Sequence, residues 1–252
     1  MARPEILALI PARGGSKGIP RKNLLPVAGR PLIAYPIATA LASRRITRTI
    51  VSTDDAEIAE ASRAAGAEVP FIRPAAYAHD TATDLDVFRH ALTWLREHEG
   101  YTCDLVVHLR TTAPVRHAAV VDEAITRLLA RPDAHALRSV SRPHQSPFKM
   151  WRPAGDFIEP LVPVAGLAEA HSQPRQVLPE VFWQSSYVDI VRPEVVLDLG
   201  MIAGHRVLPF LINDPSPDLD DVEDIPALEA ALRAMARGEP PAGAGRHNRY
   251  PG

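Results

Sequence analysis

Short apolar runs alternate with helical stretches along the first half of the chain, and this alternation constrains the fold more than any other feature. The run at residues 6–12 (ILALIPA) is typical of a buried parallel strand. Further strands are expected at residues 48–54, 68–72, 104–110 and 136–141, although Pro70 favours an edge or irregular position. Helices are expected at residues 31–43, 55–65, 80–98 and 117–130, with Pro31 as a first-turn proline. The pattern predicts an α/β fold with a doubly wound, mostly parallel Rossmann-like sheet, in which ligands bind beyond the carboxyl ends of the strands.

The second half of the chain is less regular. Residues 142–166 are richer in proline and have no clean period, which is typical of an arm, a flap or a dimerisation element. Strands near 181–191 and 206–212 and a helix at 223–237 complete the α/β pattern. We therefore predict one domain over residues 1–237, with residues 142–166 as a dimerisation arm and residues 238–252 as a disordered tail.

Composition excludes several classes of protein. Hydrophobic residues make up 46% and charged residues 23% of the chain, which is ordinary for a globular protein. The net charge of −2 provides no global field for nucleic acid or an anionic membrane, so neither is expected as a partner. The single cysteine, Cys103, cannot form an internal disulfide, and the first residues show no signal peptide. These features favour a soluble, cytoplasmic protein.

Lysine is rare in this chain and clusters in one place. Only three of the 28 cationic residues are lysine, and two of the three, Lys17 and Lys22, lie in the loop after the first strand. That loop (residues 11–23, PARGGSKGIPRKN) also holds Arg13, Arg21 and three glycines. Glycines permit close backbone approach and positive φ angles, successive amides form an anion nest, and the cations can neutralise a polyphosphate. The order of residues matches neither a Walker A loop nor a dinucleotide fingerprint.

A second candidate site lies in the acidic segment at residues 214–224 (DPSPDLDDVED). Asp218 and Asp220 are two residues apart, so in an extended backbone both carboxylates point to one face. Two such carboxylates, together with phosphate oxygens and water, are suited to Mg²⁺. The alternative is an acidic cap on the last helix, which we favour for Asp221, Glu223 and Asp224.

The glycine loop, together with residues 24–34, resembles the cytidylyltransferases that activate nine-carbon sugar acids: the CMP-sialic acid synthetase (acylneuraminate cytidylyltransferase) family with its legionaminate and pseudaminate relatives. Further matching segments follow in order over nearly the whole chain up to the tail: residues 50–55, 73–74, 80–83, 109–116, 149, 173–176 and 216–224. The resemblance implies a nucleotidyltransferase sheet, a homodimer, and a Mg²⁺-dependent reaction in which CTP and an anionic sugar acid give a CMP-sugar acid and pyrophosphate. An acceptor hydroxyl would attack the α-phosphorus, which requires in-line positioning and charge neutralisation rather than a covalent nucleophile.

The resemblance also implies roles for individual residues. Arg13 and Lys22 would be catalytic, holding the triphosphate and stabilising the leaving group. Arg110, Lys149 and Arg175 would bind the acceptor, and Asp218 with Asp220 would hold the metal. The remaining matched residues would bind the nucleotide: Ala12, Gly14, Gly15, Ser16, Lys17, Asn23, Arg73, Ala82 and Thr83.

The sequence departs from the family pattern where the acceptor is recognised. Arg110 stands where sialate enzymes have a glutamine, Ser185-Ser186 replaces Asn-Gly, and Asp189 replaces a tyrosine. Arg110 could bind a carboxylate or phosphonate in bidentate fashion, or it could form an ion pair at the end of a strand. The acceptor is therefore expected to be a nonulosonic acid, with an octulosonate, a small phosphonate or non-catalytic CTP binding as alternatives. His108 and Cys103 are interpreted as structural residues, and His79 could titrate near the nucleotide.

Overall fold

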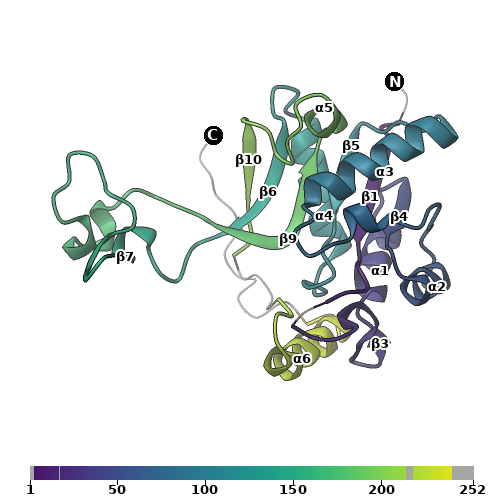
Figure 1. The fold of residues 1–252 in the computed structure, drawn as a ribbon, viewed down its shortest axis with the longest axis horizontal. Helices are drawn as coiled ribbons and strands as arrows, with labels where there is room; N and C mark the ends of the chain where they lie inside the picture. Colours follow the sequence, from purple (N-terminus) through teal and green to yellow (C-terminus); the bar gives the residue numbers. More distant parts are fainter. Residues whose placement is uncertain (1–2, 17, 214–217, 240–252) are drawn as a thin grey trace.

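The computed structural model describes residues 3–16, 18–213 and 218–239, which form a layered α/β body with a long projecting arm (Figure 1). The central sheet has the order β10-β6-β9-β5-β1-β4. Its strands are β1 (Ile6–Pro11), β4 (Arg48–Ser52), β5 (Leu105–His108), β6 (Ala136–Ser141), β9 (Trp183–Val191) and β10 (Val207–Leu211). All pairings are parallel except those of β9, which runs antiparallel to β5 and β6. The predicted doubly wound, mostly parallel sheet is confirmed.

Strand β1 shows why the sheet is covered on both faces. Its side chains alternate between two cores: Ile6, Ala8 and Ile10 pack into one, and Leu7 and Leu9 pack into the other. All five of these residues are at most 1% exposed. A strand that is apolar at every position can be stable only with a helical layer on each side.

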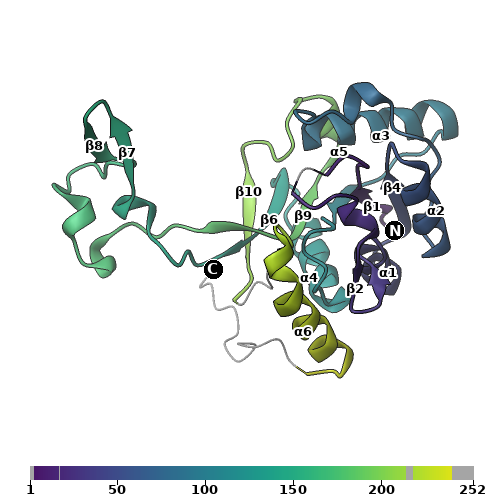
Figure 2. The same cartoon turned by 60° about the horizontal axis from the view of Figure 1, so that its bottom comes forward.

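The helices supply those two layers (Figures 1 and 2). Helices α1 (Ala34–Ala42), α2 (Ala56–Ala64) and α4 (Ala118–Leu129) contribute to one core, and α3 (Asp84–Glu99) and α5 (Pro193–Leu197) contribute to the other. Local signals fix where they begin and end. Asp55 caps α2 by accepting hydrogen bonds from two amides, and Thr83 caps α3 in a reciprocal capping box with Asp86. Gly100 ends α3 in the left-handed conformation, at φ 63°.

A third, smaller core lies beneath the sheet edge. Helix α6 (Ile225–Ala236) packs there against a hairpin of β2 (Pro26–Val27) and β3 (Arg30–Pro31). The hairpin corrects one prediction: Pro31 is not the first-turn proline of a helix, because it pairs with Pro26 and α1 begins at Ala34. Its turn places Ala28 and Gly29 at positive φ, as in tight hairpin turns.

The strand expected at residues 68–72 is also corrected. Glu68 makes a single parallel bridge to Ile50, and no strand continues from it in the described chain. Pro70 has no amide hydrogen to extend the ladder, so the segment leaves the sheet after one bridge.

The arm occupies residues 142–182, longer than the segment predicted at 142–166, and projects away from the sheet between β6 and β9 (Figure 1). It holds the hairpin of β7 (Trp151–Ala154) and β8 (Phe157–Pro160) and three short helical turns, η3 (Pro147–Lys149), η4 (Ala170–Ser172) and η5 (Arg175–Val177). Residues 240–252, most of the predicted tail, lie outside the described residues. Among the described helices, none is both long and apolar enough to cross a membrane.

Arg48 ties the edge strand β4 to the end of α3. Its guanidinium contacts Glu68 Oε2 at 2.6 Å and Glu99 Oε2 at 2.7 Å, and it lies 4.7 Å from the centre of the Tyr101 ring. The Arg48 side chain is 16% exposed, so these charge-assisted bonds are partly shielded from water.

We predict that Arg48→Gln lowers the free energy of unfolding by about 1–2 kcal/mol, because two carboxylates lose their shared partner. Urea denaturation monitored by circular dichroism checks this. The matched control is Arg131→Gln, whose pair with Asp133 is 55% exposed on both sides and is expected to leave stability unchanged. Equal effects of the two substitutions would show that the Arg48 pairs contribute no more than surface pairs.

Candidate functional site

The loop after β1 is fixed at the carboxyl edge of the sheet by hydrogen bonds to its backbone. The Ala12 amide donates to the carbonyl of Ser52 at 2.9 Å, continuing the pairing of β1 with β4. The Gly14 amide donates to Asp54 Oδ1 at 3.0 Å, and the buried Asn23 side chain donates to the carbonyl of Arg13 at 2.9 Å. Asn23, predicted to orient a nucleotide, therefore shapes the loop itself.

Glycine is required at position 14 because the backbone there lies close to the side chain of Asp55, and not because of a special φ angle. A β-carbon at Gly14 would lie 2.8 Å from Asp55 Oδ2, whereas one at Gly15 would meet open space. Gly14, Gly15 and Gly18 do not adopt the positive φ that glycine permits; in the described part of the loop Arg21 is left-handed, at φ 55°. Ser16 donates its amide to the carbonyl of Gly14, which closes a tight turn.

The cations of the loop differ in how their charge is compensated. Arg21 contacts carboxylate oxygens of Asp55 at 3.1 Å and Glu57 at 2.7 Å. Lys22 instead donates from Nζ to two main-chain carbonyls, those of Leu219 at 2.7 Å and Asp220 at 3.1 Å. Carbonyls orient an ammonium group without cancelling its charge. Lys17, a predicted nucleotide-binding residue, lies outside the described residues.

Arg13, within the loop, and Arg73, outside it, each contact an aspartate. Arg13 Nη1 contacts Asp80 Oδ1 at 3.0 Å with a third of its side chain exposed. Arg73 is buried, and burial lowers its pKa despite the opposing charge of Asp54, which lies 3.5 Å from Nη2. Asp54 accepts from both Gly14 and Arg73, so it connects the loop to Arg73, a predicted nucleotide-binding residue.

Ala82 and Thr83 precede α3 on the same edge. The Ala82 amide donates to the carbonyl of His79 at 3.0 Å. The Thr83 hydroxyl donates to Asp86 Oδ2 at 2.7 Å and accepts from the Asp86 amide, so it is engaged in capping α3. The nucleotide-binding roles of both residues stay predictions.

The two predicted metal ligands differ in environment. Asp218 is half-buried, and burial raises its pKa, with the charge of Asp220 adding to the effect. Asp220 is exposed, and its amide donates to Asp224 Oδ2 at 2.9 Å. The described residues contain no cluster of three or more His, Cys, Asp or Glu side chains that could hold a metal ion. Asp221 and Asp224 form a reciprocal capping box at η6 (Val222–Asp224). This agrees with the alternative predicted for these two residues, an acidic cap at the start of the last helix.

A buried arginine that the sequence did not single out organises the centre of this edge. Arg116 is 3% exposed and donates to the carbonyls of Tyr187, Arg110 and Ser186, the last two at 2.7 and 2.8 Å. Burial lowers its pKa to about 10, so the guanidinium remains charged at neutral pH. The position of Arg116 in the Ala-Pro-Val-Arg turn was visible in the sequence, but its carbonyl partners, 70 and 71 residues away, were not.

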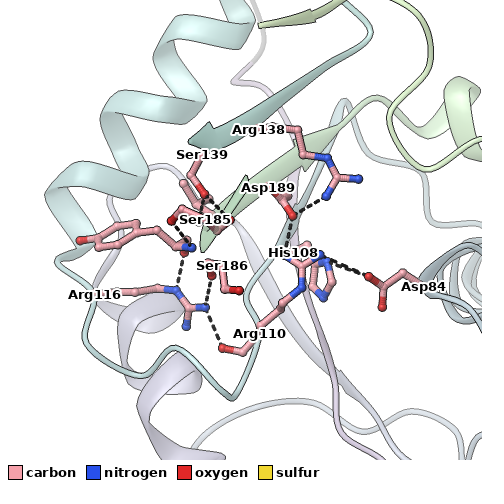
Figure 3. A network of polar contacts seen from close by, with 11 residues as sticks. Asp84, His108, Arg110, Arg116, Arg138, Ser139, Ser185, Ser186 and Asp189 are labelled. Carbon is pink, nitrogen blue, oxygen red and sulfur yellow. Dashed lines mark hydrogen bonds and ion pairs between the residues drawn. The ribbon is translucent and has the colours of Figure 1, made fainter. Parts of the chain in front are cut away.

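Arg110 lies in a cluster of charged side chains on the α3 face of the sheet (Figure 3). Its Nη1 contacts Asp189 Oδ2 at 2.5 Å and its Nη2 contacts Asp84 Oδ2 at 3.3 Å. Arg138 contacts the same Asp189 oxygen at 2.5 Å. Of the two interpretations of Arg110, the structure shows the ion pair; acceptor binding stays a prediction. Asp84, Arg138 and Asp189 were not predicted as site residues, and only Asp189 carried a signal, as a departure from the family pattern.

The other two predicted acceptor residues lie on the arm. Lys149 is exposed in η3, and Arg175 is exposed in η5, where it donates to the carbonyl of His144 at 3.2 Å. The arm projects away from the loop after β1, so one chain does not bring Lys149 or Arg175 to Arg13 and Lys22 (Figure 1). Where the arm joins the body, a cavity of about 370 Å³ is lined by residues that include Ser141, Arg142, His144, Ser185, Ser186 and Asp218.

The residues interpreted as structural are accounted for. His108 is 4% exposed, and burial with neighbouring arginines holds its pKa well below its usual value, so it is uncharged. Burial raises the pKa of Cys103 to about 12, which leaves it a thiol at neutral pH. The ring of His79 forms a hydrogen bond with the Thr81 hydroxyl, and the main-chain carbonyl of His79 accepts a hydrogen bond from Arg13.

The sheet order, the cation-bearing loop at its carboxyl edge and the opposed Asp218 together define an α/β protein of the nucleotidyltransferase fold. A solved structure with that fold, CMP:2-keto-3-deoxy-manno-octonic acid synthetase complexed with CTP, superposes with a TM-score of 0.69 over 92% of this chain and 99% of its own, at 15% identity. The profile of the cytidylyltransferase family matches residues 7–164, and the chain belongs to that family.

Curated relatives agree with the resemblance read from the sequence. Pseudaminic acid cytidylyltransferase of Campylobacter jejuni is 37% identical over 49% of this chain and 53% of its own length. CMP-N,N'-diacetyllegionaminic acid synthase of Legionella pneumophila is 38% identical over 48% of this chain and 52% of its own. The chain thus spans about half the length of these relatives, and the resemblance to the CMP-sugar acid synthetases is confirmed.

Proposed function

We propose that the protein transfers the cytidylyl group of CTP to a hydroxyl of a nonulosonic acid and releases pyrophosphate. The observation that carries this proposal is the contact of Lys22 with the carbonyls of Leu219 and Asp220. It places an ammonium group that is held by main-chain carbonyls next to the acidic segment that bears Asp218. A cation facing a carboxylate segment across the carboxyl edge of the sheet suits a triphosphate and its metal.

The chain's own residues suggest how the reaction would proceed. Lys22 and Arg13 would hold the β- and γ-phosphates and stabilise the negative charge of the leaving pyrophosphate. The side chain of Arg73 is held by Asp54, and its backbone amide donates a hydrogen bond to the carbonyl of Thr53 at 2.7 Å. Arg73 would present the edge of its guanidinium to the base. The acceptor would enter through the cavity at the root of the arm, beside Asp218. We also propose that the reaction takes place in the cytoplasm.

We predict that the protein releases pyrophosphate from CTP with a nonulosonic acid, and that Lys22→Met slows release by about 10²–10³-fold because a charge on the leaving group goes unmatched. The matched control is Arg21→Met, because Arg21 is the neighbouring cation and its charge is already paired with Asp55 and Glu57. This variant is expected to slow pyrophosphate release by less than about tenfold. A coupled phosphate assay with pseudaminic, legionaminic, sialic, octulosonic and phosphonic acids checks both. CTP binding without release across the panel would favour a non-catalytic CTP-binding protein.

The carboxylates of Asp218 and Asp220 are of a kind that suits Mg²⁺. Asp218 is held partly out of water with a raised pKa, so a divalent cation there would relieve the cost of its charge. Mg²⁺ is commonly held by one or two carboxylates, with phosphate oxygens and water completing its shell. Asp218 and Asp220 would supply those carboxylates. When bound, the ion would supply charge neutralisation of the phosphates.

We predict that Mg²⁺ and CTP together raise the melting temperature of the wild type but not of Asp218→Asn. Without metal, Asp218→Asn is expected to lose no stability, because the raised pKa means that the charged form is the costly one near neutral pH. As the pH falls through the raised pKa, the wild type gains stability that the variant lacks. Thermal shift assays check these expectations, with Glu223→Gln, an exposed residue of the same segment, as control. An equal rise in melting temperature in Asp218→Asn and Glu223→Gln would show that Asp218 does not belong to the metal site.

We further propose that the arm pairs two copies of the chain. Its hairpin exposes Phe157 at 81% and Ile158 at 62%, and Trp151 and Leu161 are also exposed. Apolar side chains gathered on one projecting hairpin are typical of a protein interface. Pairing would let the arm's Lys149 and Arg175 reach the cavity of the other copy.

We predict that the double substitution Phe157→Ser, Ile158→Ser converts a dimer into a monomer in sedimentation equilibrium and reduces turnover. The control is Leu199→Ser, which removes an apolar side chain of 50% exposure from the body and is expected to leave the dimer intact. A wild type that sediments as a monomer would contradict the pairing.

A further inference from the structure

A second cavity lies at the edge of the sheet opposite the loop after β1. Its volume is about 760 Å³, which is in the range of sites that hold small organic ligands. Three parts of the chain line it: the residues that lead into β1, the turn after α1, and one face of α4. This cavity has no role in the reaction proposed above.

Strand β1 separates this cavity from the loop that carries Arg13 and Lys22. Strands β1 and β4 are parallel, and the cavity is lined by residues 3, 4, 6, 44 and 45, at or before the start of these strands. The loop follows Pro11, at the other end of β1. A strand rises about 3.3 Å per residue, so the length of β1 places the two sites roughly 17 Å apart. The cavity is therefore separate from the proposed CTP site.

Three arginines, Arg3, Arg44 and Arg45, line the cavity, and all three are exposed. Arg3 Nη2 donates to the main-chain carbonyl of Arg44 at 2.7 Å. Within the part of the chain that the structure describes, none of the three forms an ion pair with a carboxylate. Exposed guanidinium groups without such partners can donate to phosphate oxygens in bidentate fashion, and a ligand can reach them from solvent.

Hydrogen bonds order the turn that carries Arg44 and Arg45. The Ser43 hydroxyl donates to Asp122 Oδ1, and the Arg44 amide donates to Asp122 Oδ2 at 3.0 Å. Ser43 Oγ in turn accepts from the amides of Arg45 and Ile46, at 3.1 and 3.0 Å. Both oxygens of Asp122, an acidic residue of the cavity wall, are thus engaged in holding the turn. A backbone that is fixed in advance lowers the entropic cost of binding a ligand.

Helix α4 contributes the remaining polar groups. Ala119, Glu123, Thr126 and Leu129 follow one another at steps of three or four residues, so they lie on one face of the helix, and all four line the cavity. Glu123 and Thr126 are exposed and can form hydrogen bonds with hydroxyl groups. The carboxylate of Glu123 repels an anion placed against it. The lining therefore suits a ligand with a phosphate at one end and hydroxyl groups at the other.

We propose that this cavity binds the phosphate ester of a sugar or nucleoside at a site separate from the catalytic one. The guanidinium groups of Arg3, Arg44 and Arg45 receive the phosphate, and Glu123 and Thr126 bind hydroxyl groups of the rest of the ligand. The inference goes beyond the proposed function and does not depend on it, because none of these residues belongs to the proposed CTP or acceptor site.

Isothermal titration calorimetry of the full chain with Mg²⁺, with and without saturating CTP, tests this site. The probes are glucose 6-phosphate and uridine monophosphate, and the matched controls are inorganic phosphate, glucose and uridine. With CTP present, at least one ester is expected to bind about tenfold or more tightly than inorganic phosphate and than its own unphosphorylated form. The ester that binds more tightly identifies whether the cavity accepts a sugar or a nucleoside.

The variants remove charge from the cavity or add it. Arg44→Gln combined with Arg45→Gln is expected to weaken binding of the ester about tenfold or more, because two donors to the phosphate are lost. Ala119→Glu, which adds a carboxylate and leaves the arginines in place, is expected to weaken it as well, and keeps the test valid if the double variant fails to fold. The matched control is Arg63→Gln with Arg96→Gln, two exposed arginines outside the cavity, which is expected to bind like the wild type.

The outcomes are separate from those that test the cytidylyltransferase reaction. Absence of binding by both esters at millimolar concentrations, or equal binding by the wild type and the cavity variants, would overturn the site. Binding that CTP abolishes would place the ester in the CTP site and overturn it too. Inorganic phosphate that binds as tightly as both esters would overturn the assignment to an ester. None of these measurements involves turnover, so either proposal can fail while the other holds.

Discussion

The carboxyl edge of the sheet depends on one buried cation. Arg116 donates to carbonyls of Tyr187, Ser186 and Arg110, and so it joins the turn after β5 to the returning strand β9. Strand β9 comes back from the arm in the opposite direction to its neighbours, and its pairing with β6 is irregular between Arg138 and Val140. Irregular pairing leaves carbonyls without ladder partners, and a guanidinium with five donors can satisfy several at once. Burial lowers the pKa of this cation to about 10, so these bonds offset only part of its desolvation cost, and the guanidinium remains charged at neutral pH.

The same edge shows how a nearly neutral chain can concentrate positive charge locally. The fold pairs some cations directly with carboxylates, as at Arg21, and holds others by hydrogen bonds to main-chain carbonyls, as at Lys22. The distribution of partners, rather than the number of cations, therefore creates the local positive potential. Asp218 on the opposing segment supplies the opposite condition, a carboxylate kept partly out of water. A metal-bound polyphosphate is a ligand that would relieve both at once.

Much of this architecture follows from the sequence because it is set by local rules. The apolar run of β1, the capping residues Asp55 and Thr83, and Gly100 at the end of α3 each act within one or two turns of chain. The antiparallel insertion of β9 could not be predicted, because strand order depends on where a long excursion returns, and residues 142–182 have no periodicity that reveals it. The prediction for Pro31 is wrong for a related reason. Proline suits both the first turn of a helix and an edge strand, and here the pairing of Pro31 with Pro26 in the β2–β3 hairpin decides for the strand. The loop cations were found as a cluster, but their unequal compensation comes from residues as far away as Asp220.

Arg110 and Asp189 show why departures from a family pattern are better interpreted in pairs. Taken alone, an arginine at the end of a strand is equally suited to binding an anion or to forming an ion pair. The contact between the two, across 79 residues of sequence, shows the ion pair and engages one end of the Arg110 guanidinium. Arg110 and Asp189 carry opposite charges, so together they leave the net charge of the cluster unchanged. Their ion pair also fixes the orientation of the Arg110 guanidinium. Such a pair adds no net charge to the carboxyl edge of the sheet.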